Sequence, residues 1–510
     1  MGLLTTTLVS CGGGSPGVPS APIAPHSSPS SPSSPGASSL AVCGVASILT
    51  GPATPPAGAV VVPTGVDSTL AENWTITPNT TYYFTAGMHT LGSGQYTQIQ
   101  PAGGDTFIGA PGAILDGGRN NLYAFTGQAT NVTIEYLTIQ NFGPPGSNQG
   151  AGVVNHDSGS NWTIQYNTIT NSAGAGLFLG SNNVARYNCL SDNGEYGFQV
   201  YGNATGAFGV SNVVMDHNEI TGNNTWNWEA KDPGCGCSGG GKFWNATGVT
   251  VTNNWSHANH GPGFWADTDD NDFEFENNLI EKNDDEGIMY EISYNATIEN
   301  NTFNDNGLVA GPTNPGFPTG AIYLSESGGD SRVPARYSSI TITGNTFTNN
   351  WAGVILWENS NRFCGSPANT SSSFCTLVNP SVVNLTTCVP GTIENAPYIN
   401  DCRWKTQNVL VTHNVFSLNA SEVAGCTMAV GCGSNGIFSE YATTQAGYTA
   451  ANYPYPGTMV EYNITFNQNN VFADNTYIGP WDFMALAQGD LITASQWQAA
   501  PYNQDAGSSF

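Results

Sequence analysis

The chain has 510 residues, and only 9% of them are charged, against about a quarter in an average soluble domain. Its 37 acidic and 10 basic residues give a net charge of −27. This excludes nucleic acid as a partner, because phosphate binding needs clustered Lys and Arg. The same charge disfavours long polyanionic sugars, which a negative surface repels, and leaves neutral glycans compatible.

Residues 1–11 predict a lipoprotein-type export signal. Leu8-Val9-Ser10-Cys11 resembles a bacterial lipobox, which implies cleavage before Cys11 and a lipid anchor on that residue. We expect the signal to be truncated, because its apolar stretch is short and no Lys or Arg precedes it. Residues 12–42 are rich in Ser, Pro and Gly and predict a flexible linker. The sequence has no apolar run of 18 residues, so the expected membrane contact is the anchor alone.

Eleven cysteines indicate an oxidising compartment, and the protein is expected to be extracellular, at the cell surface or in the periplasm. Cys235 and Cys237 form a C-x-C, for which disulfides to other cysteines are favoured over a metal site. No second Cys or His pair lies at zinc spacing. Short separations favour three disulfides among the remaining cysteines: Cys364–Cys375, Cys388–Cys402 and Cys426–Cys432.

A repeated motif, x-Val/Ile-x-x-Asn-x-Phe/Ile, occurs through much of residues 43–480. Its central asparagines are separated by 21, 30, 36, 24 and 23 residues, at positions 167, 188, 218, 254, 278 and 301. The shorter separations suit one turn of a three-strand solenoid, and the longer ones indicate inserted loops. One coil cannot bury its own apolar face, so stacked coils are required. The repeat therefore predicts an all-β, right-handed parallel β-helix.

The recurring asparagines predict an internal ladder of side chains at a tight turn, since Asn tolerates left-handed backbone geometry. After Trp481 the repeat is lost. Residues 493–500 predict a short helix with Thr493 or Ser495 as its N-cap. Residues 481–510 are therefore expected to form a C-terminal cap that protects the open edge of the last coil.

Two acidic residues occupy equivalent places in neighbouring coils. Asp267 and Glu291 each lie four residues after a glycine, in Gly263-Phe-Trp-Ala-Asp267 and Gly287-Ile-Met-Tyr-Glu291, and are separated by one coil of 24 residues. Adjacent strands lie about 4.7–4.9 Å apart. Retaining glycosidases need two carboxyl groups about 5–5.5 Å apart. Stacked carboxylates repel each other, so one is expected to keep its proton to higher pH.

Lys242 lies 25 residues before Asp267, near the same column, where its charge would keep Asp267 ionised. Each residue type also has a non-functional interpretation. An isolated acidic residue is more often only exposed to solvent, and about half of the tryptophans are expected to pack in the core. For His260 a role in a turn is favoured over substrate binding. With those alternatives open, the candidate substrate-binding residues are Lys242, Glu229, Trp228, Trp244, Trp265, Tyr290, His260, Glu326, Trp357 and Glu358.

The acidic run after Trp265 offers a second interpretation. Clustered carboxylate oxygens suit Ca²⁺, and the candidate ligands are Asp267, Asp269, Asp270 and Asp272. The run lacks the EF-hand glycine and terminal glutamate. A calcium-bound Asp267 would not be a free nucleophile, and the hydrolase interpretation requires no cofactor.

The stretch from Gly239 to Asn301 resembles the core of bacterial right-handed β-helix glycosidases of the β-xylosidase type. A Gly-Lys coil is followed by Trp-x-Asp, by Glu one coil later and by an Asn-Asn coil. The resemblance implies that Asp267 is the nucleophile and Glu291 the acid/base. It covers about sixty residues, and elsewhere it is to pectin-lyase-like β-helices in general. The run Asp267-Thr-Asp-Asp-Asn-Asp272 departs from the Asp-Trp-Met-type continuation, which leaves the sugar open.

The favoured function is a retaining glycoside hydrolase, expected to be a monomer, that acts on a neutral polysaccharide or oligosaccharide such as a xylan. One alternative is a polysaccharide lyase or uronate epimerase that uses Lys242 and a calcium site. The scarcity of Arg and the net charge of −27 weigh against it. The other alternative is a non-catalytic surface protein that binds glycans, since the fold alone does not decide function.

Overall fold

The computed structural model describes residues 37–66, 76–126, 129–146, 152–201, 209–232, 236, 238–313, 319–328, 339–359, 382–384, 386–387, 404–426, 431–440 and 457–510. All of them belong to one compact unit, residues 34–510. The predicted signal and Cys11, the linker up to residue 36, and the cysteines at 235, 237, 364, 375, 388 and 402 lie outside the described residues.

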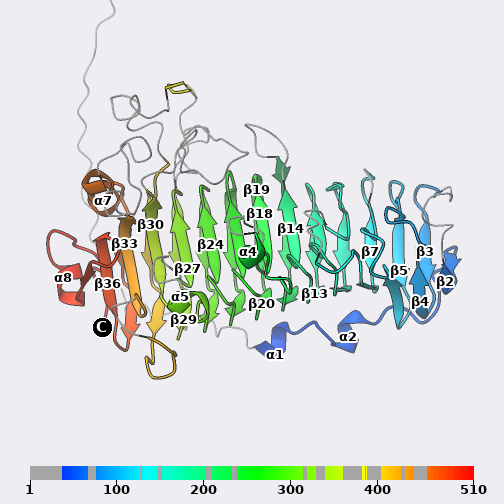
Figure 1. The fold of residues 1–510 in the computed structure, drawn as a ribbon, viewed down its shortest axis with the longest axis horizontal. Coiled ribbons are helices and arrows are strands. Elements are labelled where there is room, and N and C mark those ends of the chain that lie inside the picture. The colour runs from blue at the N-terminus through cyan, green and yellow to red at the C-terminus, as the bar shows by residue number, and fades with distance from the viewer. Residues whose placement is uncertain are drawn as a thin grey trace, which may run out of the picture. The chain divides into compact units, whose positions relative to one another are not determined.

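Three long sheets build the fold, and successive coils add one strand to a sheet (Figure 1). Sheet A consists of β1 (Val60–Val62), β3 (Thr81–Phe84), β5 (Thr106–Gly109), β7 (Thr133–Glu135), β9 (Thr163–Gln165), β12 (Val184–Arg186), β16 (Val214–Asp216), β19 (Ala246–Thr252), β22 (Asn271–Glu276), β25 (Ala296–Glu299), β28 (Ile340–Thr343), β31 (Val409–Thr412) and β34 (Val471–Ala473), with β15 (Val210–Ser211) paired to β19.

Sheet B follows sheet A in every coil. Its strands are β2 (Gly65–Val66), β4 (Gly87–Thr90), β6 (Ala113–Asp116), β8 (Thr138–Gln140), β10 (Thr168–Thr170), β13 (Cys189–Ser191), β17 (Glu219–Thr221), β20 (Trp255–His257), β23 (Leu279–Glu281), β26 (Thr302–Asn304), β29 (Thr346–Thr348), β32 (Val415–Ser417) and β35 (Thr476–Ile478).

Sheet C closes the coils from Leu177 onward. Its strands are β11 (Leu177–Leu179), β14 (Phe198–Tyr201), β18 (Gly241–Trp244), β21 (Phe264–Asp267), β24 (Ile288–Glu291), β27 (Ile322–Ser325), β30 (Val354–Asn359), β33 (Ser434–Glu440), β36 (Asp482–Ala487) and β37 (Leu491–Ile492). Described strand pairs are parallel except β36 with β37. The predicted all-β, right-handed parallel β-helix is confirmed.

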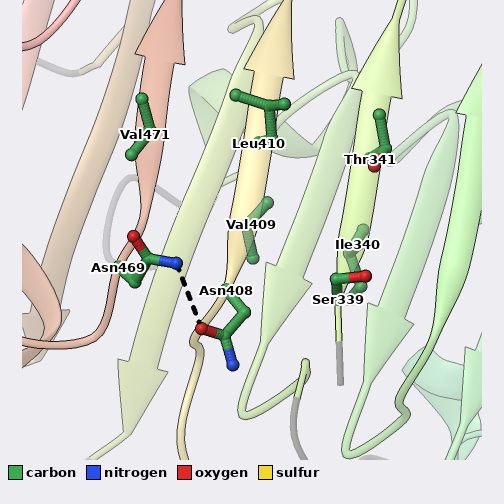
Figure 2. Close-up of a pocket in the computed structure, with 8 residues that line it drawn as sticks. All are labelled: Ser339, Ile340, Thr341, Asn408, Val409, Leu410, Asn469 and Val471. Carbon is green, nitrogen blue, oxygen red and sulfur yellow. Dashed lines mark hydrogen bonds between the residues drawn. The ribbon is translucent and has the colours of Figure 1, made fainter. Parts of the chain in front are cut away.

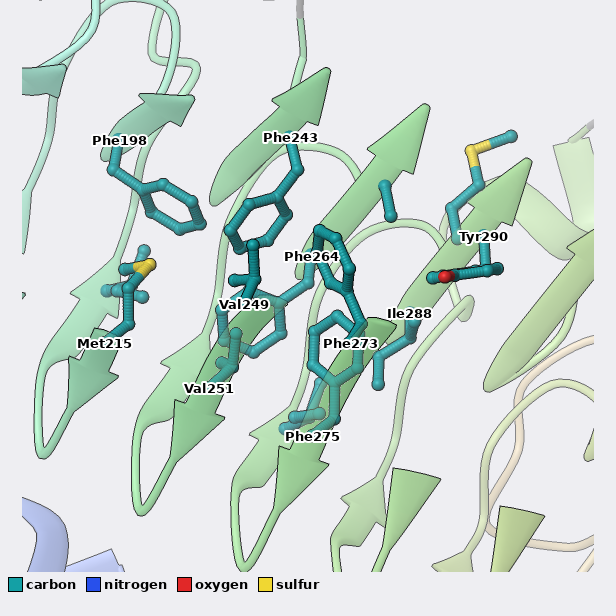
Figure 3. Close-up of a cluster of buried hydrophobic side chains, with 14 of the residues drawn as sticks. Phe198, Met215, Phe243, Val249, Val251, Phe264, Phe273, Phe275, Ile288 and Tyr290 are labelled. Atoms are coloured by element: carbon teal, nitrogen blue, oxygen red, sulfur yellow. The ribbon is translucent and has the colours of Figure 1, made fainter. Parts of the chain in front are cut away.

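The core is the space between the three sheets. Phe198, Phe243 and Phe264, from consecutive strands of sheet C, point inward and are fully buried (Figure 3). Phe243 meets Phe273 of sheet A at 5.1 Å between ring centroids, and Phe264 meets Phe275 at 5.9 Å. Because side chains alternate along a strand, the residues between these point outward. The outer face of sheet C is thus set by the same alternation that fills the core.

The predicted asparagine ladder is confirmed, but the left-handed conformation belongs to the residue before each ladder position, such as Asn253 (φ 55°) before Asn254. The amide of Asn254 donates to Oδ1 of Asn278 at 3.1 Å, and that same oxygen accepts the backbone N–H of Asn254 at 2.9 Å. Equivalent bonds run from Asn167 to Asn475. A second ladder at the next corner was not predicted, and it consists of Asn193, Asn223, Asn259, Asn283, Asn306 and Asn350. Both ladders satisfy backbone groups that the turns leave without a partner.

The described helices are short and lie outside the coils. They are α1 (Ala37–Leu40), α2 (Ala46–Leu49), α4 (Trp228–Lys231), α5 (Ala310–Thr313), α7 (Gly457–Phe466) and α8 (Ala494–Gln498). The predicted C-terminal helix is α8, and Thr493 caps it in a reciprocal capping box with Gln496. Within the described residues, no helix has the length and apolar character needed to span a membrane.

Two disulfides join described cysteines. Cys426–Cys432 confirms the pairing predicted from its short separation. Cys43–Cys189 was not predicted, and it fastens the segment that carries α1 and α2 to β13. Glu219 adds to this attachment, because one carboxylate oxygen accepts the N–H groups of Val42 (2.7 Å) and Cys43 (2.8 Å).

Candidate functional site

The candidate pair lies on the outer face of sheet C. Asp267, the last residue of β21, is paired in register with Glu291, the last residue of β24. The register derived from the two glycine-started segments is therefore confirmed. Phe264 and Ala266 point into the core, so the residues that alternate with them, Trp265 and Asp267, point outward. The two carboxyl groups consequently leave the same face of the sheet on adjacent strands.

Lys242 reaches Asp267 from the preceding strand. It is in register with Trp265, two residues short of Asp267, but its side chain spans the offset and its Nζ lies 2.8 Å from Asp267 Oδ2. Nζ also donates to the carbonyl of Gly236 at 2.9 Å and lies 3.7 Å from the centroid of the Trp265 ring. Lys242 and Asp267 are 5% and 6% exposed. Two buried charges need this close pairing to offset their desolvation.

Glu291 is held by a separate set of donors. Its Oε2 accepts the indole N–H of Trp265 at 3.1 Å, and its Oε1 accepts the hydroxyls of Ser325 at 3.2 Å and Tyr323 at 3.5 Å. Trp265 thus touches both halves of the site, with its ring under Lys242 and its N–H on Glu291. Such contacts restrict the rotamers of both acids, which catalysis requires.

Three other predicted residues lie near the pair. Trp244 shares the outward face of β18, and Lys242 Nζ lies 5.2 Å from its ring. Glu229 and Trp228 belong to α4, which packs against Tyr196: Trp228 shares a hydrophobic cluster with Tyr196, and Glu229 acts on it electrostatically. Strands β18 and β21 therefore bring Lys242, Trp244 and Trp265 together beside Asp267.

Tyr290 points into the core, so its prediction as a substrate-binding residue is wrong. It alternates with Glu291 on β24, so its ring points inward, is fully buried and packs on Phe273 at 6.0 Å. Its hydroxyl donates to the carbonyl of Tyr294 at 3.1 Å. Figure 3 shows it among the core side chains. Tyr290 therefore cannot contact a substrate on the outer face.

Glu326, Glu358 and His260 have partners outside the Asp267–Glu291 pair. Glu326 is buried and accepts the N–H of Asn359, and Glu358 is buried and accepts the N–H of Thr406 at 3.2 Å. Both carboxylates bind the backbone of neighbouring segments. His260 has a half-exposed side chain and pairs with Asp284 at 2.9 Å, before β21 begins.

Trp357 lies on β30, two strands beyond Glu291, and is buried, with 4% of its surface exposed. Its ring packs beside Tyr323 at 5.8 Å between centroids. Trp357 therefore contacts Tyr323, whose hydroxyl donates to Glu291.

Three of the four aspartates proposed as calcium ligands have protein partners. Asp267 is paired with Lys242, Asp270 accepts the N–H of Ala246 at 2.9 Å, and the exposed Asp272 accepts the amide of Asn295 at 2.9 Å. In the described part of the chain, no three Asp, Glu, His or Cys side chains are arranged to hold a metal ion. Burial and the neighbouring Asp267 and Asp269 raise the pKa of Asp270 well above its usual value, although the Ala246 N–H opposes this.

Sequence reasoning missed three acids at the start of the sheet C strands. Burial raises the pKa of Glu195 to about 8, although Lys242 opposes this shift. Burial and repulsion between neighbours also raise the pKa values of Asp285 and Glu286. The sequence held a signal for two of these acids. Glu195 lies two residues before Gly197, which precedes β14, and Glu286 lies directly before Gly287, which precedes β24. Lys242 acts electrostatically on Glu195, and Glu291 acts on Glu286, so these two acids lie near the Asp267–Glu291 pair.

A hollow of about 420 Å³ lies elsewhere, on sheet A across β28, β31 and β34 (Figure 2). No ionisable side chain lines it, and within its polar lining the side-chain amide of Asn469 donates a hydrogen bond to Asn408 Oδ1 at 3.2 Å. The hollow contains none of the candidate residues. It is lined by Ser339, Ile340, Thr341, Asn408, Val409, Leu410, Asn469 and Val471.

Comparison with known families agrees with the fold. The family model described as "Right handed beta helix region" matches residues 65–230 and 205–333, together more than half of the chain. No curated protein matches the chain.

Several solved structures are similar to this chain at low identity. The catalytic domain of a GH87 alpha-1,3-glucanase is 12% identical, with 90% of this chain and 70% of that chain covered and a TM-score of 0.48. A PL6 alginate lyase is 13% identical, with 90% of this chain and 85% of that chain covered and a TM-score of 0.42. The Azotobacter vinelandii mannuronan C-5 epimerase AlgE4 A-module is 13% identical, with 66% of this chain and 86% of that chain covered and a TM-score of 0.40.

Proposed function

We propose that this chain, which belongs to the right-handed β-helix family, is a glycoside hydrolase whose reaction takes place on the outer face of sheet C. The observation that carries the proposal is the register of Asp267 with Glu291 on adjacent strands. Strands are about 4.8 Å apart. That spacing suits the carboxyl separation of about 5–5.5 Å in retaining glycosidases better than the wider separation of inverting ones.

In the proposed reaction, Asp267 attacks the anomeric carbon while Glu291 gives a proton to the leaving oxygen. Glu291 then takes a proton from water, and the water oxygen displaces Asp267 from the sugar. Lys242 supports this assignment, because its 2.8 Å ion pair with Asp267 holds the carboxylate in one orientation. The hydroxyls of Tyr323 and Ser325 keep Glu291 oriented.

Aromatic rings beside the pair supply a platform for sugar rings, whose C–H faces are apolar. Trp244 and Trp265 point outward on β18 and β21, and neither is fully buried. The disulfides Cys43–Cys189 and Cys426–Cys432 fit action outside the cytoplasm, in an oxidising compartment. We include export and the Cys11 anchor in the proposal on that basis.

The test is a screen of polysaccharides with wild-type protein, D267N, E291Q and the control E274Q, which removes an exposed acid on sheet A. Loss of a general acid/base costs about 10²–10⁴-fold in rate. We expect that loss in E291Q, a loss at least as large in D267N, and wild-type activity in E274Q. Proton NMR of the first product should show retention of anomeric configuration.

Two results would overturn this assignment. Full activity in D267N would remove the nucleophile, and an inverted product would replace the double displacement by direct attack of water. A product that absorbs as an unsaturated uronate would instead support a lyase, with Lys242 as the nearest cation to the pair. Binding without cleavage of any glycan would support a surface protein that only binds.

A further inference from the structure

The outer face of sheet C is closed on the C-terminal side of the candidate pair. Ser325 and Trp357 follow Glu291 in register on β27 and β30. Tyr323 and Ile355 precede them by two residues and therefore share the outward side of the same strands. All four side chains are buried, with at most 4% of their surface exposed. Further along, α7 packs against β30, β33 and β36 (Figure 1). These four positions therefore offer almost no surface to a ligand.

The same face is open on the N-terminal side of the candidate pair. Tyr201, the last residue of β14, is 39% exposed. Trp244 of β18 and Trp265 of β21 are partly exposed, and so is Gln199, which lies two residues before Tyr201. A ligand that reaches the candidate pair therefore finds surface to bind on this one side of it.

The strand register brings these side chains into line with the candidate pair. Tyr201 is paired with Trp244. In the same two strands Gln199 is paired with Lys242, whose Nζ lies 2.8 Å from Asp267. The rings of Tyr201 and Trp244 are 6.2 Å apart between centroids and tilted by 40°, so neither ring lies flat on the other. Trp244 is thus one strand from Asp267, and Tyr201 is two strands from it.

The exposed part of this surface is aromatic and uncharged. Its side chains are those of Gln199, Tyr201, Trp244 and Trp265, whereas the charges of Lys242 and its partner are buried and balance each other. Sugar rings pack their apolar C–H faces on aromatic rings, and a side-chain amide both donates to and accepts from hydroxyl groups. The net charge of −27 repels a polyanion. A neutral glycan is therefore the ligand that suits this surface.

We propose that the substrate is an oligosaccharide or polysaccharide whose chain extends from the candidate pair across β18 and β14, toward the N-terminal end of the solenoid. Strands are about 4.8 Å apart, which is close to the length of one sugar unit in an extended chain. Trp244 binds the sugar beside the reacting one, Tyr201 binds the sugar after it, and Gln199 bonds to their hydroxyls. The proposal rests on the proposed function, because the candidate pair marks the bond that is cleaved.

The experiment compares binding of long and short glycans by isothermal titration calorimetry. The probes are xylohexaose, cellohexaose, laminarihexaose and mannohexaose, each with its disaccharide, and E291Q is the background so that cleavage does not interfere. We expect at least one hexasaccharide to bind about tenfold tighter than its disaccharide, because added aromatic contacts are worth about this much. Adding Y201A should remove most of that difference, and Q199A should reduce it. Y201F should keep it, since the ring remains.

Y462A is the matched control. Tyr462 is also an exposed tyrosine, with 57% of its surface exposed, but it belongs to α7. Its replacement should leave the affinities of E291Q unchanged. In the active protein, Y201A should raise KM for the hexasaccharide more than it lowers kcat, as loss of a contact away from the reacting bond does. Circular dichroism and thermal melts establish that every variant is folded.

The proposal is overturned if no hexasaccharide binds, if hexasaccharide and disaccharide bind equally, or if Y201A changes affinity no more than Y462A does. These results leave the proposed hydrolase standing when D267N and E291Q abolish cleavage of a neutral glycan. Conversely, a preference for long chains that depends on Tyr201, together with full activity in D267N, would reject the mechanism and keep the glycan-binding surface.

Discussion

The turn that follows Asp267 adopts a conformation that few residues tolerate. Thr268 and Asp269 have φ angles of 60° and 61°, in the left-handed region that β-branched residues rarely occupy. Their N–H groups donate to the carbonyls of Glu291 at 3.0 Å and Ile292 at 2.9 Å. Thr268 Oγ1 also donates to Asp267 at 2.8 Å. The strained turn ties the end of β21 to the end of β24 and thereby fixes Asp267 opposite Glu291.

Glu195 gives a prediction at the same scale. Burial raises its pKa to about 8, although Lys242 opposes this, so the folded protein binds a proton that the unfolded chain releases near pH 4.5. Its contribution to stability is present below about pH 4.5 and is lost as pH rises to about 8. Each pKa unit is worth about 1.4 kcal/mol. We expect E195Q to melt at a higher temperature than wild type at about pH 8 and to have a flatter melting profile with pH.

Thermal melts across this pH range provide the check, with E274Q as the control that should follow the wild-type profile. If E195Q and wild type lose stability in parallel, Glu195 is not the group that titrates in this window.

At the scale of elements, the asparagine ladders join coils that vary in length. Asn218, Asn254 and Asn278 are separated by 36 and 24 residues in sequence, yet they make the same bonds. The inserted residues leave the coil as loops or as α4, so the ladder keeps its register. Because the period along a strand is two, a slip of one residue would turn Asp267 inward. The ladders therefore protect the geometry of the site.

Asn254 tests this role. Its amide donates to the carbonyls of Met215 and Thr252, both at 3.0 Å, and to Asn278, and its own oxygen accepts from Asn218. Each buried group left unpaired costs about 1–3 kcal/mol. We expect N254A to lower the free energy of unfolding by at least about 3 kcal/mol in urea denaturation.

N182G is the matched control for this change. Asn182 is exposed and has a φ of 59°, which glycine adopts readily. Its replacement should therefore change stability little. Equal losses in N254A and N182G would contradict a special role for the internal ladder.

At the scale of the whole molecule, contacts between neighbouring coils hold the solenoid together, and the N-terminal segment is the exception. Cys43–Cys189 joins residues 146 apart in sequence, whereas Cys426–Cys432 joins residues 6 apart. The chain-entropy estimate assigns about 5 kcal/mol to the long loop and about 2 kcal/mol to the short one. We expect C43A/C189A to lower the melting temperature more than C426A/C432A. Calorimetry of the two double variants measures this, and an equal or reversed order would reject the estimate.

The sequence by itself determined the repeat and the register of its coils. A period of about one coil and the alternation of apolar residues require stacked parallel strands, and they place Asp267 in register with Glu291. Within the described cysteines, only the disulfide between near neighbours, Cys426–Cys432, was predictable. Alternation would also have shown that Tyr290 points inward, had it been applied to β24 residue by residue.

The tertiary structure decided which side chains from different coils and loops come into contact. These contacts depend on loops of unequal length and on how far each side chain reaches. Periodicity fixes a residue's place in its coil, but it does not say that Lys242 spans two residues to Asp267, or that α4 brings Glu229 toward Asp285. It also does not give the Cys43–Cys189 contact. Burial set the pKa values of Glu195 and Glu286. These features arise where distant segments meet on one face, because the free energy of a charge depends on all its neighbours in space.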